Sequence, residues 1–308
     1  MNAGGAGYPL CMTFTLDPGQ PIPKTVSKAA EKQLRKIVEA LTDQAGLDPD
    51  EATHDARKRT KKLRALLRLV RPELGEKVYR RENRALRDAA RRLSPVRDAW
   101  VLVEALDGLV APPDEDIDPA SVAALRAVLV REHRMLQEDQ AEGRTAQRSA
   151  EEFERVLARV ARWPLRDNGW RSLEEGLEAV TRAGRKAMAA AEAAGTAEAF
   201  HEWRKQVKYL RHQFALLRQV WPDVLDAMEA TADELGEVLG ADHDLAVLRE
   251  RVETASVLLP ASRKALVRRI DARRTGHRSE ALTLGHRLYA EKPSGLTDRL
   301  GRLWNAAA

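Results

Sequence analysis

The sequence has a single cysteine, few aromatic residues and no long apolar run, and each shortage excludes a class of protein. Cys11 has no second cysteine with which to form an intramolecular disulfide, which favours a reducing compartment such as the cytoplasm. Every apolar stretch is shorter than the roughly 20 residues that a membrane-spanning helix requires. Aromatic residues make up only 5% of the chain, whereas the helix formers Ala, Leu, Glu, Arg and Lys recur throughout. We therefore predict an all-α, cytoplasmic protein that does not bind a membrane.

Motifs of catalysis and of metal binding are also missing. The sequence contains no Walker loop, no GxSxG motif, no kinase signature, and neither the CxxC nor the HExxH spacing of a zinc site. The acidic segment 111–119 lacks the residue order of an EF-hand calcium loop. We therefore expect no catalytic residue, no cofactor and no metal. Zinc held by several histidines together stays an alternative, although no local spacing supports it.

Positive charge is concentrated rather than abundant. The formal net charge is only +5, from 52 Lys and Arg against 47 Asp and Glu, so the arrangement of the cations carries more information than their number. Residues 54–71 hold eight Lys or Arg side chains against one acid, Asp55. On a helix, the leucines of this segment gather on one face, and a basic stripe runs along the other. The stripe consists of Arg57, Lys61, Arg64 and Arg68.

A single basic stripe is most often a solvated helix face. Such faces normally alternate with glutamate, because like charges one turn apart cost about a few tenths of a kcal/mol per pair. This stripe has no glutamate four residues away from its cations, and a similar stripe returns at 201–221. The repetition favours an anionic ligand, and arginine in particular offers two parallel N–H donors to phosphate oxygens.

The repetition extends beyond one helix. Five residues of the first basic segment recur 147 residues later in the same order, and residues 93–98 match residues 239–244 at an offset of 146. The five pairs are His54 and His201, Arg57 and Arg204, Lys58 and Lys205, Lys61 and Lys208, and Arg64 and Arg211. Two motifs repeated in order indicate an internal duplication. We predict two pseudo-twofold-related halves, each a bundle of about four helices, whose basic helices can face one common cavity.

The helical domain is expected to follow a lead-in rich in glycine and proline. We predict that residues 1–24 form a flexible N-terminal arm and that residues 25–305 form the domain. The first repeat is placed at about 25–145 and the second at about 146–305. A further basic helix is expected from residue 74 to residue 92, with Arg80, Arg81, Arg84, Arg87 and Arg91.

Three histidines are candidate ligand contacts. His54 and His201 begin the two basic helices; each alone would be interpreted as structural, but their equivalent positions favour contact with an anion. His243 lies at a predicted helix start, where backbone N–H groups attract anions. Asp98 and Asp244 occupy equivalent positions and are interpreted as acids that favour a helix N-terminus or hold a nearby arginine.

These features together resemble the CHAD domain, the conserved histidine α-helical domain. The family pattern has two His-x-x-Arg-Lys/Arg-x-x-Lys/Arg-x-Leu-Arg helices, each followed by a Leu-Gly-type turn and a helix that carries Asp. Residues 54–64 with 93–98, and residues 201–211 with 239–244, fit this pattern in order. An Arg-x-x-Arg element at 182–185 and closing helices similar to those of the family extend the resemblance to nearly the whole chain.

The resemblance implies two four-helix bundles around a basic groove or pore that binds inorganic polyphosphate without cutting it. Phosphate or sulfate ions would mimic the polymer there. Arg97 stands where the second repeat has His243, and Tyr209 replaces Lys62, so the two halves are expected to contribute unequally. The expected polyphosphate contacts are His54, Arg57, Lys58, Lys61, Arg64, Arg68, Arg182, Arg185, His201, Arg204, Lys205, Lys208, Arg211 and His243.

Two other functions stay open from the sequence. A cationic groove also attracts the phosphodiester backbone of RNA or DNA, although the stripes carry little aromatic interleaving for base stacking. A metal-dependent phosphohydrolase is the second alternative, although the Glu-x-Glu-x-Lys strand of the triphosphate tunnel hydrolases is absent. The sequence contains no feature that sets the oligomeric state.

Overall fold

The computed structural model describes residues 14–42, 46–111, 115–142 and 144–308, which contain helices and no strand. The all-α prediction is therefore confirmed. The helices of the first half are α1 (Ile22–Leu41), α2 (Pro49–Leu69), α3 (Arg71–Arg92), α4 (Ser94–Val110), α5 (Pro119–Glu142) and α6 (Thr145–Val160). Those of the second half are α7 (Arg171–Ala194), α8 (Ala197–Leu217), the 3₁₀-helix η1 (Arg218–Val220), α9 (Pro222–Thr254), α10 (Pro260–Leu288) and α11 (Pro293–Ala307). None of them combines the length and the hydropathy that crossing a bilayer would require.

Side-chain caps begin both basic helices, α2 and α8. The Asp48 carboxylate accepts a hydrogen bond from the backbone N–H of Asp50 at 2.7 Å, and Pro49 occupies the first turn of α2, where a missing N–H costs little. The Thr196 hydroxyl accepts a hydrogen bond from the backbone N–H of Ala199 at 3.2 Å. Each basic helix therefore starts at a position that its own sequence specifies.

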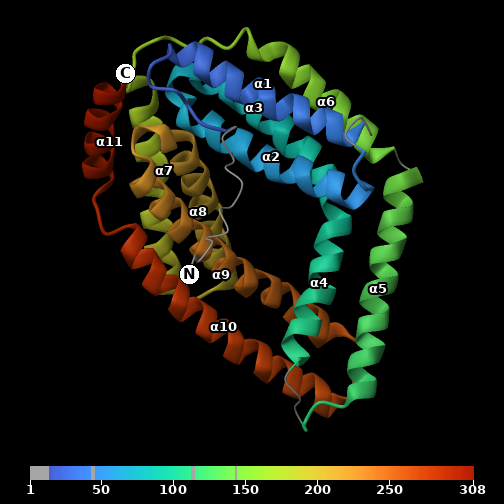
Figure 1. Cartoon of the computed structure of the whole chain (residues 1–308). Coiled ribbons are helices and arrows are strands. Elements are labelled where there is room, and N and C mark those ends of the chain that lie inside the picture. The colour runs from blue at the N-terminus through green and yellow to red at the C-terminus, as the bar shows by residue number, and fades with distance from the viewer. Residues whose placement is uncertain (1–13, 43–45, 112–114, 143) are drawn as a thin grey trace, which may run out of the picture.

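Four helices of the first half, α1, α2, α3 and α6, pack side by side (Figure 1). Their apolar faces form a core in which Leu66 and Leu67 of α2 are fully buried. The completely buried carboxylate of Glu82 on α3 accepts hydrogen bonds from the Arg159 guanidinium on α6 at 2.8 to 3.2 Å. α6 buries its apolar face against α1 and α3. The repeat boundary that we expected at about residue 146 stays a prediction.

The remaining helices are organised around α8. α7 and α9 pack against α8, α10 runs along α9, and α11 packs on α7 (Figure 1). Among the largest fully buried side chains are Trp203 and Phe214 of α8 and, with 2% exposed, Trp304 of α11. Since α2 contacts both α7 and α8, one hydrophobic core runs through both halves of the chain. A pseudo-twofold relation between the halves stays a prediction.

A second, smaller core lies away from the basic helices. It forms where α4 packs on α5 and on α9, and where α9 packs on α10. Its buried side chains include Val103, Leu106, Leu125, Leu248 and Leu266. Figure 1 shows α4 and α5 along one edge of the molecule and α10 along another. We call this region the distal part.

The predicted flexible arm is wrong for residues 14–24. Phe14 and Leu16 are buried in the core, and the backbone N–H of Leu16 donates to the carbonyl oxygen of Leu216 at 2.7 Å. α1 already begins at Ile22, which is also buried. The apolar side chains of this segment thus anchor it to the fold, whereas residues 1–13 lie outside the described residues.

Candidate functional site

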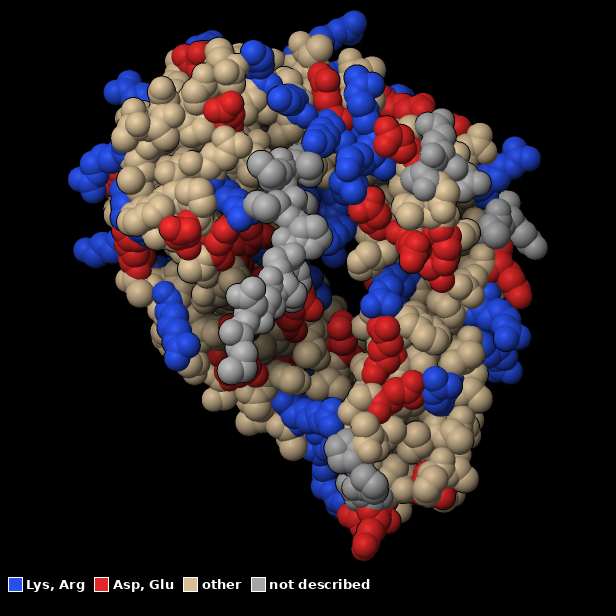
Figure 2. Space-filling model, in the orientation of Figure 1, with Lys and Arg blue, Asp and Glu red and all other residues tan. Residues whose placement is uncertain are grey.

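The two basic helices meet in the folded chain, because α2 packs against α8. This contact brings Lys61 on α2 close to Arg204 and Lys208 on α8. The charge of Arg204 lowers the pKa of both lysines, and the charge of Lys61 lowers the pKa of Lys208. We call these three residues the central cluster. Figure 2 shows Lys and Arg side chains gathered over α2 at the margin of a hollow, with Asp and Glu side chains along the opposite margin.

The three cations of the central cluster have no partner among the residues that the structure describes, since none forms a hydrogen bond or an ion pair there. The Nε atom of Arg204 is buried and unsatisfied. Its guanidinium lies against Gly240, where an added Cβ would stand 2.9 Å from Nη2 of Arg204. A side chain at residue 240 would therefore require the Arg204 guanidinium to shift.

Burial and mutual repulsion lower the pKa values of the central cluster. Desolvation and the charges of Arg204 and Lys61 lower the pKa of Lys208 to about 7. Desolvation, with Arg57 and Arg204, lowers the pKa of Lys61 to about 8. Desolvation also lowers the pKa of Arg204. Lys208 and Arg204 are half-buried, whereas Lys61 is exposed. Water therefore screens the charge of Lys61 more, and the pKa of Lys208 is the more strongly lowered of the two.

Acidic side chains from other helices stand opposite part of the basic stripe. Arg57 donates to the Asp98 carboxylate on α4 at 2.9 Å and to the Ser94 carbonyl at 3.2 Å. Arg211 forms an ion pair with Asp233 on α9. The tertiary structure therefore supplies a carboxylate to Arg57 of the α2 stripe and another to Arg211 of α8. The interpretation of Asp98 as the partner of a nearby arginine is confirmed.

Asp244 does not lie in a first helical turn, contrary to our interpretation. α9 runs without interruption from Pro222 to Thr254, so residues 242–244 lie in its middle. Burial raises the pKa of the Asp244 carboxyl, while Arg204 and Lys208 oppose that rise. Together with Glu237, Asp244 contributes negative charge beside the central cluster.

The stripe of α2 continues from the central cluster towards α3. Arg64 and Arg68 both donate to the side-chain carbonyl of Asn83 on α3, at 3.0 and 3.2 Å. The Arg68 guanidinium also stacks on the ring of Tyr209 at 3.7 Å, and burial lowers the pKa of Arg68. In the sequence, Tyr209 is visible only as a departure from the repeat. No motif marks Asn83, so its contact with the two arginines could not be predicted.

The structure brings two of the three candidate histidines together. The rings of His201 and His243 lie 4.3 Å apart, beside Arg204. Desolvation lowers the pKa of both, and the charge of Arg204 lowers both further. The proximity of His243 also lowers the pKa of His201. The predicted helix start at His243 is wrong, because α9 is continuous there and its backbone N–H groups are used within the helix. His54 is exposed near Arg97, and its pKa is lowered as well.

The other predicted contacts lie at varying distances from the central cluster. Lys58 is exposed and acts on His54, whereas Lys205 pairs with Glu202 on its own helix. Arg182 pairs with Glu178 on α7, and Arg185 is exposed on the same helix. No hydrogen bond or ion pair within the described part of the chain connects Arg182 or Arg185 to the cluster. The structure therefore does not group these two arginines with it.

Comparison with known proteins identifies the family. The sequence profile of the CHAD domain matches residues 28–253. This chain belongs to the CHAD domain family. Among solved structures, PptA from Streptomyces chartreusis resembles this CHAD protein with a TM-score of 0.61 and 14% identity, over 88% of this chain and 100% of that chain. At this identity the similarity shows a shared fold alone, and no curated protein matches the chain.

The CHAD match contains both basic helices and every residue of the central cluster. It ends just before the C-terminus of α9, so α10 and α11 lie outside it. In the residues that the structure describes, no three His, Cys, Asp or Glu side chains come together as they would to hold a metal ion. The central cluster of the CHAD protein consists of three cations that form no ion pair with the described residues.

Proposed function

We propose that this CHAD protein binds inorganic polyphosphate, without cutting it, through the central cluster and the neighbouring cations of α2 and α8. The observation that supports the proposal most strongly is the unpaired state of Lys61, Arg204 and Lys208. Bringing these charges together in a partly desolvated place is unfavourable in the free protein. A polyanion would relieve that cost, because its phosphates supply the missing negative charge and hydrogen-bond acceptors.

A linear polymer fits the arrangement of the cations better than a single small anion does. From Arg57 to Arg68 the stripe rises about 16 Å along α2, so its cations can contact successive units of one chain. Membership of the CHAD family, whose sequence pattern we associate with polyphosphate, supports the same ligand. The ring of Tyr209 beside the stripe is buried and has Arg68 stacked on it, so it offers little surface on which a nucleobase could stack.

The proposal is tested by charge reversal at Lys208, with Lys264→Glu as the matched control. Lys264 is exposed on α10, outside the family match. We expect Lys208→Glu to weaken binding of long-chain polyphosphate by about tenfold or more, and the control to change it by less than about twofold. Lys208→Gln should give an intermediate loss. Thermal unfolding of each variant checks that the fold is retained.

Equal affinity of wild type and Lys208→Glu would contradict this site, and absence of binding at low salt would contradict the ligand. A competition at equal phosphate concentration separates the two polymers. If RNA displaced polyphosphate, nucleic acid would become the preferred ligand. Orthophosphate release measured over time in the presence of magnesium or manganese tests the hydrolase alternative, and we expect none.

A further inference from the structure

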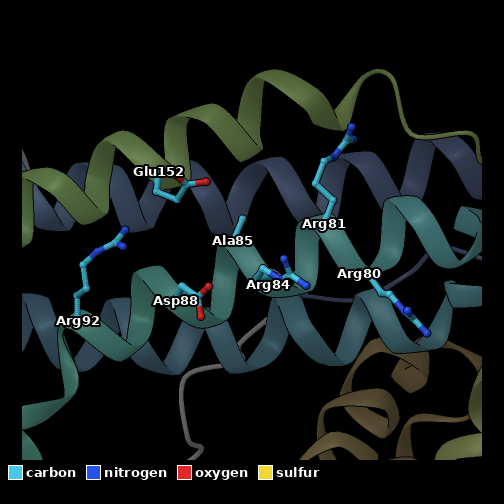
Figure 3. A pocket seen from close by; sticks show the side chains of 7 residues that line it. All are labelled: Arg80, Arg81, Arg84, Ala85, Asp88, Arg92 and Glu152. Carbon is cyan, nitrogen blue, oxygen red and sulfur yellow. The ribbon is translucent and has the colours of Figure 1, made fainter.

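The exposed face of α3 carries arginines that the central cluster does not use. A shallow pocket of about 490 Å³ lies between α3 and α6. Its charged lining consists of Asp88, Glu152 and four arginines, Arg80, Arg81, Arg84 and Arg92. Figure 3 shows the arginines projecting from α3, with Glu152 on the facing helix α6. We call this the α3 pocket.

Two arginines of the α3 pocket, Arg84 and Arg92, form no hydrogen bond or ion pair with any residue that the structure describes. The acids beside them are already engaged. Asp88 accepts from Arg87 at 2.8 Å, and Glu152 is held by a neighbouring arginine on α6. The pocket therefore presents positive charge and unused N–H donors to solvent.

The α3 pocket continues the basic stripe of α2. Arg68, near the end of α2, and Arg71, at the start of α3, both lie over the ring of Tyr79, at 5.9 and 4.6 Å from its centroid. Glu76 then accepts hydrogen bonds from both Arg71 and Arg80. Figure 3 shows Arg80 extending away from α6. Cations thus follow one another from the stripe, around the α2–α3 corner, to the pocket.

We propose that the α3 pocket is a second phosphate subsite, which holds the part of a long polyphosphate chain that extends beyond the central cluster. Arg84 and Arg92 lie about 12 Å apart along α3, so they would contact different phosphates of one chain. The inference rests on the proposed function and adds selectivity for chain length. A short chain occupies the central cluster only, whereas a long chain also reaches the pocket and releases more counterions.

The test uses the double variant Arg84→Glu/Arg92→Glu, with Arg287→Glu/Arg302→Glu as a control. The control makes the same change of charge at exposed residues of α10 and α11. Each protein is titrated with tripolyphosphate and with long-chain polyphosphate at two salt concentrations. We expect the pocket variant to lose about tenfold in affinity for the long chain and less than about twofold for tripolyphosphate, with a smaller dependence on salt. The control should keep both affinities within about twofold of wild type.

The outcomes separate this subsite from the proposed function. If the pocket variant bound the long chain as wild type does, while Lys208→Glu still lost affinity, the subsite would be wrong and the central cluster would stand. Equal losses for both ligands would also overturn the subsite, because they would indicate a general effect of charge. If wild type bound neither ligand, both proposals would fall. Arg84→Gln/Arg92→Gln, with an unchanged unfolding transition, shows that the loss does not come from misfolding.

Discussion

At the scale of single residues, the charge of Lys208 depends on small changes of pH near neutrality. Its pKa of about 7 results from burial and from the positive charges of Arg204 and Lys61. Asp244 and Glu237 limit the shift, since both favour the charged ammonium. The free protein therefore holds this lysine between its two protonation states, and a nearby polyanion would favour the charged one.

We predict that binding of polyphosphate takes up protons and weakens as the pH rises. Below a pH of about 7 the free protein already carries the Lys208 charge, and binding requires no proton at this lysine. Above it, the ligand must restore the proton that Lys208 has lost, and Lys61 adds the same requirement from a pH of about 8. Affinity should therefore fall through this window. Calorimetry in two buffers of different ionisation enthalpy measures the uptake, which Lys208→Gln should reduce. An affinity independent of pH would contradict the linkage.

At the scale of helices, the two copies of the repeated turn adopt different structures. In the first copy α3 ends and α4 begins at Ser94-Pro95, because proline has no N–H to continue the helix. In the second copy Gly240-Ala241 lies inside α9. A glycine there costs about 1 kcal/mol of helix stability, but burial against Arg204 and the core outweighs that cost. Both places were expected to be helix boundaries. Pro95 enforces the boundary in the first copy, whereas the second copy has no proline and packing keeps Gly240 inside α9.

The contact between α2 and α7 depends on Gly176, and we predict opposite effects of alanine at two helical glycines. A Cβ at Gly176 would overlap the carbonyl oxygen of Leu69, so Gly176→Ala should lower the free energy of unfolding by about 1 to 3 kcal/mol. Gly276 on α10 is exposed, with no atom near the position that a Cβ would take, so Gly276→Ala should raise it by about 0.5 to 1 kcal/mol. Denaturant unfolding measures both. A neutral Gly176→Ala would contradict this close approach of the helices.

At the scale of the whole molecule, the basic helices sit on the larger of two cores. α2 and α8 bury their apolar faces in the core that joins both halves. α4, α5 and the adjoining ends of α9 and α10 share the smaller distal core. α5 contributes little to that core beyond its first half, and no residue from 130 to 140 is buried. The proposed binding surface thus lies on the more extensively packed part of the protein.

We predict that the distal part opens more readily than the basic helices. Backbone amides of α5 should exchange with deuterium faster than those of α2, because fewer buried apolar contacts protect them. Mass spectrometry of exchanged peptides measures the difference. Leu248→Ala, which opens a cavity in the distal core, should accelerate exchange in α5 and leave α2 unchanged. If α2 and α5 exchanged at the same rate, the two cores would form one cooperative unit.

The sequence by itself determined the helical class, the CHAD resemblance and the two basic stripes, since periodicity and capping act over a few residues. It failed at residues 14–24, because their apolar side chains find partners far away in the chain. Tertiary structure alone decided which cations stay unpaired. Arg57 and Arg211 form ion pairs with carboxylates of α4 and α9, whereas Lys61, Arg204 and Lys208 form none with the residues that the structure describes. Charge pairing depends on distance in space, and the fold sets those distances.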